Sequence, residues 1–377
     1  MSHLQIPKIS SSLSKMWIKV LNIENSLFPN LKESLRIEKF SHKESKLIKI
    51  LDFAQIEKFV NTTSLTNSPK DRKQIARAFI AKSVYNIQTT RDLIDRLHID
   101  RTLRILCGWR YKNSIPSETT FSRAFREFSK LQIAQKTHEK FVAEYLIKKT
   151  FFYNATDATK IPQREKAVKV EKVKPKPKKR GRPKKGEIRE PAKPSILQKQ
   201  KEMQTVKEKL SLVSTDCGVG VKQNSKGYKE TWIGSKLHIN AVDGDIPITA
   251  FYSGANVHDS SVALPLMQET SKRVNYFYDP QDAGYDADII REFSIQLGHR
   301  TIIDINPKNS QDLRDKIALK EHEEKVFEKV LNERHLDLDK QHYNQRSMVE
   351  RVNKYLKDDF GCHIIYYQGA TLCLHSL

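Results

Sequence analysis

The sequence predicts a mixed α/β fold, in which a sheet is flanked by helices and preceded by a mainly helical region. From residue 151 onward, short β-branched and aromatic runs alternate with segments of helical periodicity. In the first 150 residues, apolar side chains recur at helical spacing and glycine is nearly absent. A chain of 377 residues is long enough for a sizeable core and for about two domains.

The first 150 residues are expected to form a helical DNA-binding or dimerisation region, with helices over 44–60, 71–85 and 117–129. In the third helix a stripe at i, i+3, i+4 and i+7 comprises Phe121, Ala124, Phe125 and Phe128. This helix fits either the second helix of a DNA-reading helix-turn-helix or plain core packing with solvated arginines.

A first strand is expected over 151–157, with Asp157 near its end. A basic insertion follows at 163–205, and the stretch 163–210 holds 18 Lys and Arg against 6 Asp and Glu. Because it is rich in Lys and Pro and lacks an apolar period before about residue 196, its first part is expected to be disordered or extended.

The remaining elements complete the sheet. Two antiparallel strands are expected at Glu230–Val242 and Ile246–Tyr252, joined by a turn at Asp243-Gly244-Asp245. The elements expected after them, in order, are a helix from Asp259, a strand at Val274–Tyr278, a helix at 287–297, a strand at Thr301–Ile305, a charged helix through about 333, and a helix at 343–357.

The last predicted helix separates polar from apolar residues. Its polar face carries Tyr343, Arg346, Glu350, Asn353 and Lys357. The opposite face carries Met348, Val349, Val352, Tyr355 and Leu356. A carboxylate held between two cations suits a metal-assisted phosphate site. Taken alone, the segment is equally compatible with a surface helix that carries ordinary ion pairs.

Composition indicates a polyanionic partner. The formal net charge is +22 and the pI about 9.6, which favours nucleic acid or a membrane surface as the partner. No run of 18 apolar residues and no signal-peptide core is present, so membrane insertion and secretion are not expected. Four scattered cysteines and no HExxH motif argue against a disulfide framework or zinc site and for a reducing cytoplasm.

Three acids are candidates for a shared metal site. Asp157 ends the first strand, Asp282 follows a later strand, and Glu350 lies on a following helix, which is where an RNase H-like fold brings three acids together. Phosphodiester attack by water or a 3′ hydroxyl needs two divalent cations about 4 Å apart, and Mg²⁺ prefers carboxylate oxygens. Asp279 and Asp286 compete with Asp282, which we prefer because Pro280 makes Asp279 look like a turn residue.

The sequence resembles the DDE transposases of bacterial insertion sequences that carry the Y-(2)-R-(3)-E-(6)-K signature, which stands here as Tyr343, Arg346, Glu350 and Lys357. The resemblance covers roughly residues 70–370. It extends through Pro116–Arg123, Asn154–Asp157, Trp232–His238, Ile246–Ile248, Ala255–Asp259 and Gln281–Asp286.

The resemblance implies a catalytic, metal-binding triad of Asp157, Asp282 and Glu350, with Mg²⁺ as cofactor and Mn²⁺ able to substitute. It further implies that Tyr343, Arg346 and Lys357 contact the transposon-end DNA. The implied reaction is cleavage at each element end, followed by attack of the freed 3′ hydroxyl on target DNA. The implied partners are double-stranded end and target DNA and, because two ends are cut, a second copy of the chain in a homodimer. The implied location is the bacterial cytoplasm, at the nucleoid.

The basic insertion matches an AT-hook, a short motif that lies in the A/T minor groove. Its core is Arg180, Gly181, Arg182 and Pro183, flanked by lysines. A non-specific cationic linker is the alternative. Deleting 174–186 should weaken DNA binding and flatten its salt dependence.

These readings divide the chain into a helical region at 1–150, a catalytic domain at 151–162 and 206–360, the insertion at 163–205 and a tail at 361–377. Family members usually continue past the Glu helix with a further apolar helix, whereas this chain stops at Leu377, so we expect a shortened C terminus and leave the activity of this copy open. Two rival readings are a non-catalytic DNA-binding protein, such as a transposase remnant, and an RNase H-like nuclease for repair or RNA processing.

Overall fold

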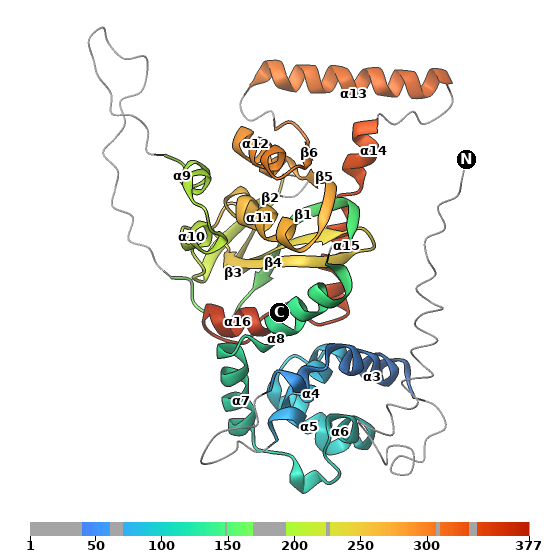
Figure 1. Cartoon of the computed structure of the whole chain (residues 1–377), viewed down its shortest axis with the longest axis vertical. Helices are drawn as coiled ribbons and strands as arrows, with labels where there is room; N and C mark the ends of the chain where they lie inside the picture. Colours follow the sequence, from blue (N-terminus) through green and yellow to red (C-terminus); the bar gives the residue numbers. More distant parts are fainter. Residues whose placement is uncertain are drawn as a thin grey trace, which may run out of the picture. The chain divides into compact units, whose positions relative to one another are not determined.

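The computed structural model describes residues 40–60, 71–147, 149–168, 194–223, 227–306, 310–331 and 338–376. The chain divides into two compact units (Figure 1). The first comprises Met1–Phe141 with Asp358–Gly361, and the second comprises Val142–Lys357 with Cys362–Leu377. None of the helices in the described ranges combines the length and apolarity that crossing a bilayer requires.

The first unit is helical in its described part, as predicted. Its elements are α3 (His42–Ala54), η1 (Ile56–Lys58), α4 (Arg72–Val84), α5 (Thr90–Ile99), α6 (Arg101–Cys107), η2 (Lys112–Ser114), α7 (Glu118–Lys130) and α8 (Ile133–Phe141). Side chains at the helix starts satisfy free backbone N–H groups: Ser41 and Glu44 form a capping box on α3, and Asp100 accepts from the Leu103 N–H on α6.

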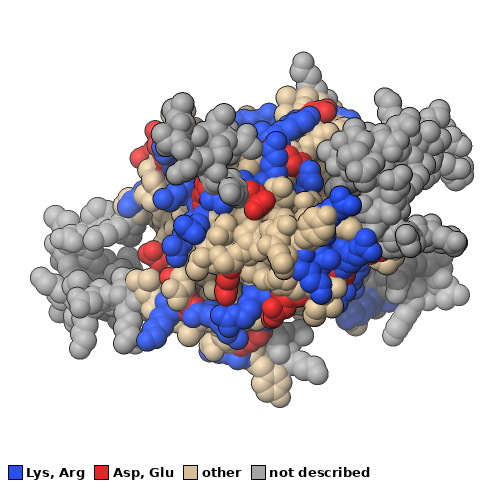
Figure 2. All heavy atoms as spheres, turned by 90° about the horizontal axis from the view of Figure 1, so that it is seen from below, with Lys and Arg blue, Asp and Glu red and all other residues tan. Residues whose placement is uncertain are grey.

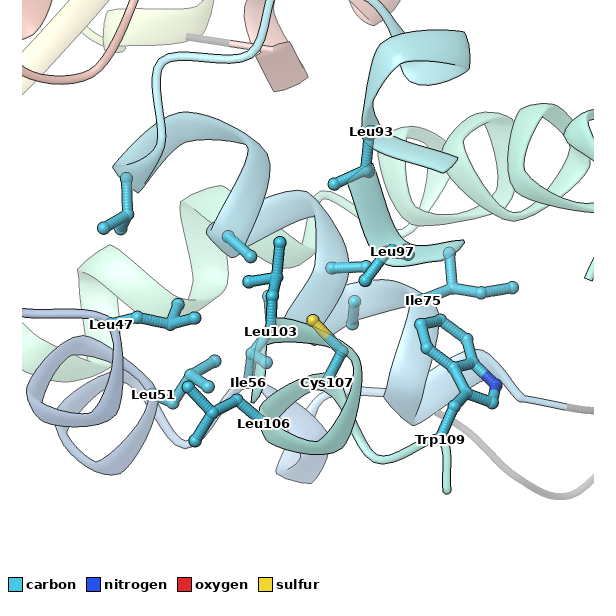
Figure 3. Close-up of a cluster of buried hydrophobic side chains, with 14 of the residues drawn as sticks. Leu47, Leu51, Ile56, Ile75, Leu93, Leu97, Leu103, Leu106, Cys107 and Trp109 are labelled. Carbon is cyan, nitrogen blue, oxygen red and sulfur yellow. The ribbon is translucent and has the colours of Figure 1, made fainter. Parts of the chain in front are cut away.

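One apolar core holds these helices together, built from leucine, isoleucine and aromatic side chains of α3 to α8 (Figure 3). The predicted stripe on α7 belongs here, since Phe121, Ala124 and Phe128 are buried in this core. Arg123 and Arg126 on the opposite side of α7 are exposed. The packing half of the prediction for α7 is therefore confirmed, and DNA reading by its outer face stays a prediction.

The second unit contains a six-stranded mixed sheet. Its strands are β1 (Thr150–Pro162), β2 (Gly218–Gln223), β3 (Lys229–Val242), β4 (Ile246–Gly254), β5 (Asn275–Gln281) and β6 (Arg300–Ile303). β3 pairs antiparallel with β1 on one side and with β2 and then β4 on the other. β1 pairs parallel with β5, and β5 pairs parallel with β6. The sheet therefore changes from antiparallel to parallel at β1.

Helices cover both faces of this sheet (Figure 1). The helices of the second unit, not all of which lie on the sheet, are η3 (Val142–Leu146), α9 (Ile196–Glu202), α10 (Val206–Ser211), η4 (Asp259–Val262), α11 (Ala263–Arg273), η5 (Ala283–Tyr285), α12 (Asp288–Gln296), α13 (Gln311–Leu331), α14 (Leu338–Asn344), α15 (Ser347–Asp358) and α16 (Ala370–Ser376). α15 packs Met348, Val349 and Val352 on one face of β1 and β3, where Leu237 and Ile239 point.

α11 lies on the other face, where the alternate residues of the strands point. There the buried contacts are partly polar: Thr156 Oγ1 donates to Asn240 Oδ1 at 2.7 Å, and Asn240 Nδ2 donates to Thr270 Oγ1 of α11 at 2.9 Å. β1 therefore lies between two helical layers, with successive side chains directed to opposite layers.

Three elements differ from the prediction. β1 continues to Pro162, so Asp157 lies in the middle of the strand and not near its end, because pairing with β3 continues from Asn154 to Pro162. β2 was missed, since it is short and contains two glycines, which are rare in strands. α9, at the C-terminal side of the predicted insertion 163–205, is not a difference, because it begins at Ile196, where an apolar period was expected to start.

The third difference concerns the helix predicted at 343–357, which is two helices separated at Gln345 and Arg346. α14 is fixed on the sheet by His342, whose ring stacks on Tyr278 at 4.4 Å and whose Nδ1 shares a hydrogen bond of 2.7 Å with the Tyr153 hydroxyl. α15 is fixed by its own apolar contacts. Tyr355, expected on the packed face, is 48% exposed.

Candidate active site

A cavity of about 530 Å³ in the second unit contains all three predicted acids in its lining, Asp157, Asp282 and Glu350. It lies where β5 ends: the parallel pairing with β1 stops at Thr156 and Gln281, and the next residues of both strands line the cavity. Sites at the carboxyl ends of parallel strands are common because side chains from several loops converge there. The fold thus brings together three acids that are far apart in sequence.

Asp157 is held by α15. Its Oδ2 accepts from Asn353 Nδ2 at 3.0 Å, and Asn353 is itself 7% exposed. Burial raises the pKa of Asp157 to about 6, against the opposing effects of the Ala158 N–H and the nearby Arg346 and Lys222 charges. The carboxylate is therefore desolvated, which is costly for a free anion and favourable for one that gains a cation.

Asp282 follows β5 directly and caps the short helix η5, where its Oδ1 accepts from the Ala283 N–H at 2.8 Å. The two competing acids lie elsewhere. Asp279 is fully buried and accepts from Asn154 Nδ2 at 3.0 Å. Asp286 is paired with Arg291 at 2.6 Å and also accepts from the Asn306 N–H. Of the three, Asp282 is the one in the cavity lining.

Glu350 is exposed on the first turn of α15 and pairs with Arg346, with 2.8 Å between Oε1 and Nη1. The positive charge of Arg346 also acts on Asp157 and Asp282, which places one guanidinium among the three acids. Arg346 in turn lies over the Tyr343 ring, 5.7 Å from its centroid. Despite the break before α15, the signature residues stay grouped.

The sequence prediction missed one acid and its partner. Asp259 lines the cavity and pairs with Lys236 at 2.8 Å, and Lys236 Nζ also donates to the Val257 carbonyl. Both residues lie in segments that carried the family resemblance, Trp232–His238 and Ala255–Asp259, and this was the available signal. Asn353, predicted on the polar face of the helix without a role, is the partner of Asp157.

The types of side chain in the cavity fit a metal site, but the distances between them do not by themselves form one. Within the described ranges, no group of three or more His, Cys, Asp and Glu side chains is close enough together to hold an ion. The cavity nevertheless offers several carboxylates and no thiol or imidazole in its lining, which is the donor chemistry that hard cations such as Mg²⁺ prefer. The residues present fit the implied cation by chemistry.

The other predicted DNA contacts fall in two places. Lys357 lines the cavity together with Glu350 and Asn353. The AT-hook residues Arg180, Gly181, Arg182 and Pro183 lie outside the described residues. Elsewhere, Lys and Arg side chains are spread over much of the face that Figure 2 shows, with Asp and Glu between them.

Two family descriptions match the chain. "Transposase domain (DUF772)" matches residues 33–127, and "Transposase DDE domain" matches residues 154–370. The second match covers more than half of the chain and includes all three acids of the cavity. A search of curated proteins gives no match.

Proposed function

Because this chain belongs to the DDE transposase family, we propose that it binds the ends of an insertion sequence and cleaves them with Asp157, Asp282 and Glu350 as its catalytic residues. One observation carries the proposal: three carboxylates from a strand, a strand end and a helix line one cavity inside the matched DDE region. The proposed products are freed 3′ hydroxyls that attack target DNA.

The sheet supports an RNase H-like assignment for the catalytic domain. The strand path β4-β3-β1-β5-β6 has antiparallel pairs up to β1 and parallel pairs after it. An acid in the central strand β1 and an acid just after the neighbouring parallel strand β5 then share one end of the sheet. α15 supplies the third acid from the helical layer on one face.

The proposal assigns Mg²⁺, with Mn²⁺ as a substitute, to Asp157, Asp282 and Glu350, where a bound cation would polarise the scissile phosphate and favour deprotonation of the attacking hydroxyl. The protein's own part is positioning. Asn353 orients the Asp157 carboxylate, and the η5 backbone orients that of Asp282. Arg346, which balances the acids here, is placed to bind a phosphate oxygen when DNA enters.

Tyr343, Arg346 and Lys357 are proposed to contact the end DNA around the scissile phosphate. Arg346 lies between Tyr343 and Glu350, and Lys357 lines the same cavity. Double-stranded DNA as partner and a homodimer in the paired-end complex belong to the same proposal. The net charge of +22 supports a polyanionic partner.

Cleavage of labelled end DNA by three single variants tests the assignment. Asp157→Asn, Asp282→Asn and Glu350→Gln keep side-chain shape and remove the charge that a cation needs. We expect cleavage to fall by at least about 10³-fold with Mg²⁺ while duplex binding is retained. Glu202→Gln, an exposed acid on α9, is the matched control and should cut normally. A triad variant that cuts at the wild-type rate removes that residue from the site.

The products distinguish the rival functions. A transposase joins the cut end to a target plasmid, whereas a repair nuclease leaves cut DNA unjoined. A protein that only binds DNA leaves end DNA intact with both Mg²⁺ and Mn²⁺. Genomic inverted repeats that flank the gene, bordered by short direct duplications, would support the first outcome independently.

A further inference from the structure

We propose that the side of this cavity formed by β2 and β3 binds the single DNA strand next to the cleaved bond, with lysines on its phosphates and Trp232 stacked on a base. The inference rests on the proposed function and extends it, because neither the three catalytic acids nor the signature residues belong to this wall. Its lining residues are Val221, Lys222, Tyr228, Lys229, Glu230 and Trp232, with Lys160 of β1 beside them.

Lysines outnumber the one acid, Glu230, on this wall. Lys222 of β2 and Lys229 of β3 are both exposed. The two strands are paired, with Lys222 opposite Glu230 and Gln223 opposite Lys229. Lys160 of β1 reaches the same strands through its ion pair with Glu230. A polyanion that extends from the acids therefore meets several ammonium groups held on rigid strands. Lysines along a groove are the usual way to follow a phosphate backbone.

Trp232 is held in place for stacking. It lies opposite Gly220 in the β2–β3 register, and a Cβ built on Gly220 would lie 2.3 Å from Trp232 Cζ2. The indole therefore packs directly over the bare backbone of Gly220, and its Nε1 donates to the Ser235 carbonyl at 3.4 Å. A ring fixed in this way and still lining a cavity is a ready platform for an unstacked base.

The combination selects a single strand over a duplex. Base pairs in a duplex are already stacked, so an aromatic ring gains from a base only where the strand has opened or the nucleotide has flipped out. The cavity volume, about 530 Å³, is in the range of sites that take one or a few small groups, such as an unpaired nucleotide. The proposed occupant is thus a short, opened stretch of the strand that is being cut.

The lysines are tested by binding in EDTA, where no cleavage occurs. Fluorescence anisotropy measures the affinity of a labelled single-stranded oligonucleotide of the end sequence at several salt concentrations. The double variant Lys222→Ala/Lys229→Ala should lower the slope of log K against log salt by about 1.4, at about 0.7 per lost phosphate contact. The control Lys199→Ala/Lys207→Ala removes the same charge from α9 and α10, outside the cavity lining, and should keep the slope. Equal slopes for both double variants would overturn the proposal.

Trp232 is tested with 2-aminopurine, a base whose fluorescence changes with stacking, placed at successive positions near the cleaved bond. Wild type should quench it at one position, Trp232→Ala should lose that quenching and bind the strand about 5- to 100-fold more weakly, and Trp232→Phe should restore both in part. Gly220→Ala, which forces the ring to move, should reduce quenching while the rest of the site stays unchanged. Quenching that persists in Trp232→Ala overturns the stacking role.

Different results would contradict the catalytic assignment and the strand-binding wall. If the triad variants lose cleavage but Lys222→Ala/Lys229→Ala and Trp232→Ala bind strand like wild type, the active site stands and this wall is not its strand subsite. If the wall variants lose strand binding but the triad variants still cut, the wall binds DNA and the catalytic assignment is wrong. Circular dichroism of each variant separates loss of folding from loss of contact.

Discussion

At the scale of single residues, Asn353 decides how Asp157 is presented. It is nearly buried, follows Glu350 by one helical turn, and donates to Asp157 Oδ2 at 3.0 Å. One side of α15 thus supplies a proposed catalytic acid and the group that orients another. Residues that orient a metal-binding carboxylate affect activity without touching the substrate.

We expect Asn353→Ala to lower cleavage about 10- to 100-fold while the protein stays folded. Removal of the amide takes away the side-chain donor from α15 that orients the buried Asp157 carboxylate, so the concentration of Mg²⁺ needed for half-maximal cleavage should rise. A titration of cleavage rate against Mg²⁺ measures this. Asn353→Asp adds a further negative charge beside Asp157 and should not rescue the loss. Unchanged Mg²⁺ dependence in Asn353→Ala would show that Asp157 needs no positioning by α15.

The burial of Asp279 makes the stability of the fold depend on pH. Full burial raises the pKa of Asp279 to about 7, from an ordinary 3.8, so the folded state binds a proton more tightly than the unfolded chain. The stability from this group is complete below about pH 4 and is lost as the pH rises to about 7, where the buried carboxyl ionises.

Asp279→Asn keeps an acceptor for Asn154 and removes the ionisation. The free energy of unfolding of this variant, relative to wild type, should therefore rise between pH 4.5 and pH 7.5 by on the order of 1–4 kcal/mol. Urea unfolding at both pH values measures it. Asp288→Asn, an exposed acid at the start of α12, is the control and should show no such change. A constant difference across this range would mean that Asp279 is ionised throughout.

At the residue scale, spacing in the sequence indicated which acids lie near one another. The signature from Tyr343 to Lys357 and the residues around Asp282 identified three acids that do line one cavity. It could not identify the ion pair of Asp259 with Lys236 or the indole over Gly220, because these contacts join strands and loops whose registers the sequence leaves open.

At the scale of elements, β3 requires a glycine at the point where its pairing changes from β2 to β4. Gly234 is the last residue that pairs with β2, and the next residue, Ser235, pairs with β4. Its φ is +153°, and a Cβ there would lie 2.2 Å from the Ile161 carbonyl oxygen of β1. The close approach of β1 and β3, which places Asp157 and Trp232 near one cavity, therefore requires glycine at this position.

We expect Gly234→Ala to lower the free energy of unfolding by about 2–4 kcal/mol, because the methyl group must separate two paired strands. Gly284→Ala is the matched control: nothing lies within 4 Å of the added Cβ, so its unfolding should follow wild type. Urea unfolding of the two variants side by side measures the difference. Equal stability would show that β1 and β3 separate here without cost.

Elements were predictable where their patterns are local. The β3–β4 hairpin followed from its Asp-Gly-Asp turn, and α7 from its aromatic stripe. The break between α14 and α15 was not predictable, because helical periodicity continues through Gln345 and Arg346. It arises from tertiary contacts, with His342 stacked on Tyr278 and Val349 packed against the sheet. Such contacts override local propensity.

At the scale of the whole molecule, charge is unevenly distributed along the chain. The stretch 163–210 supplies 18 of the 67 Lys and Arg residues, and it separates β1 from the rest of the catalytic sheet. Within it, Arg180, Gly181 and Arg182 form the proposed AT-hook. Under this proposal, an insertion at this point would add DNA affinity without altering the strands that carry the acids.

Deleting 174–186 removes eight Lys and Arg residues and should weaken duplex binding while flattening its dependence on salt. The charge-preserving double variant Arg180→Lys/Arg182→Lys separates the two readings of the segment. An AT-hook needs the flat guanidinium groups in a narrow groove, so this variant should lose its preference for A/T-rich over G/C-rich competitor DNA with nearly the wild-type salt slope. A cationic linker would show no A/T preference in either protein. Competition binding at fixed salt therefore decides whether the insertion reads groove shape or only supplies charge.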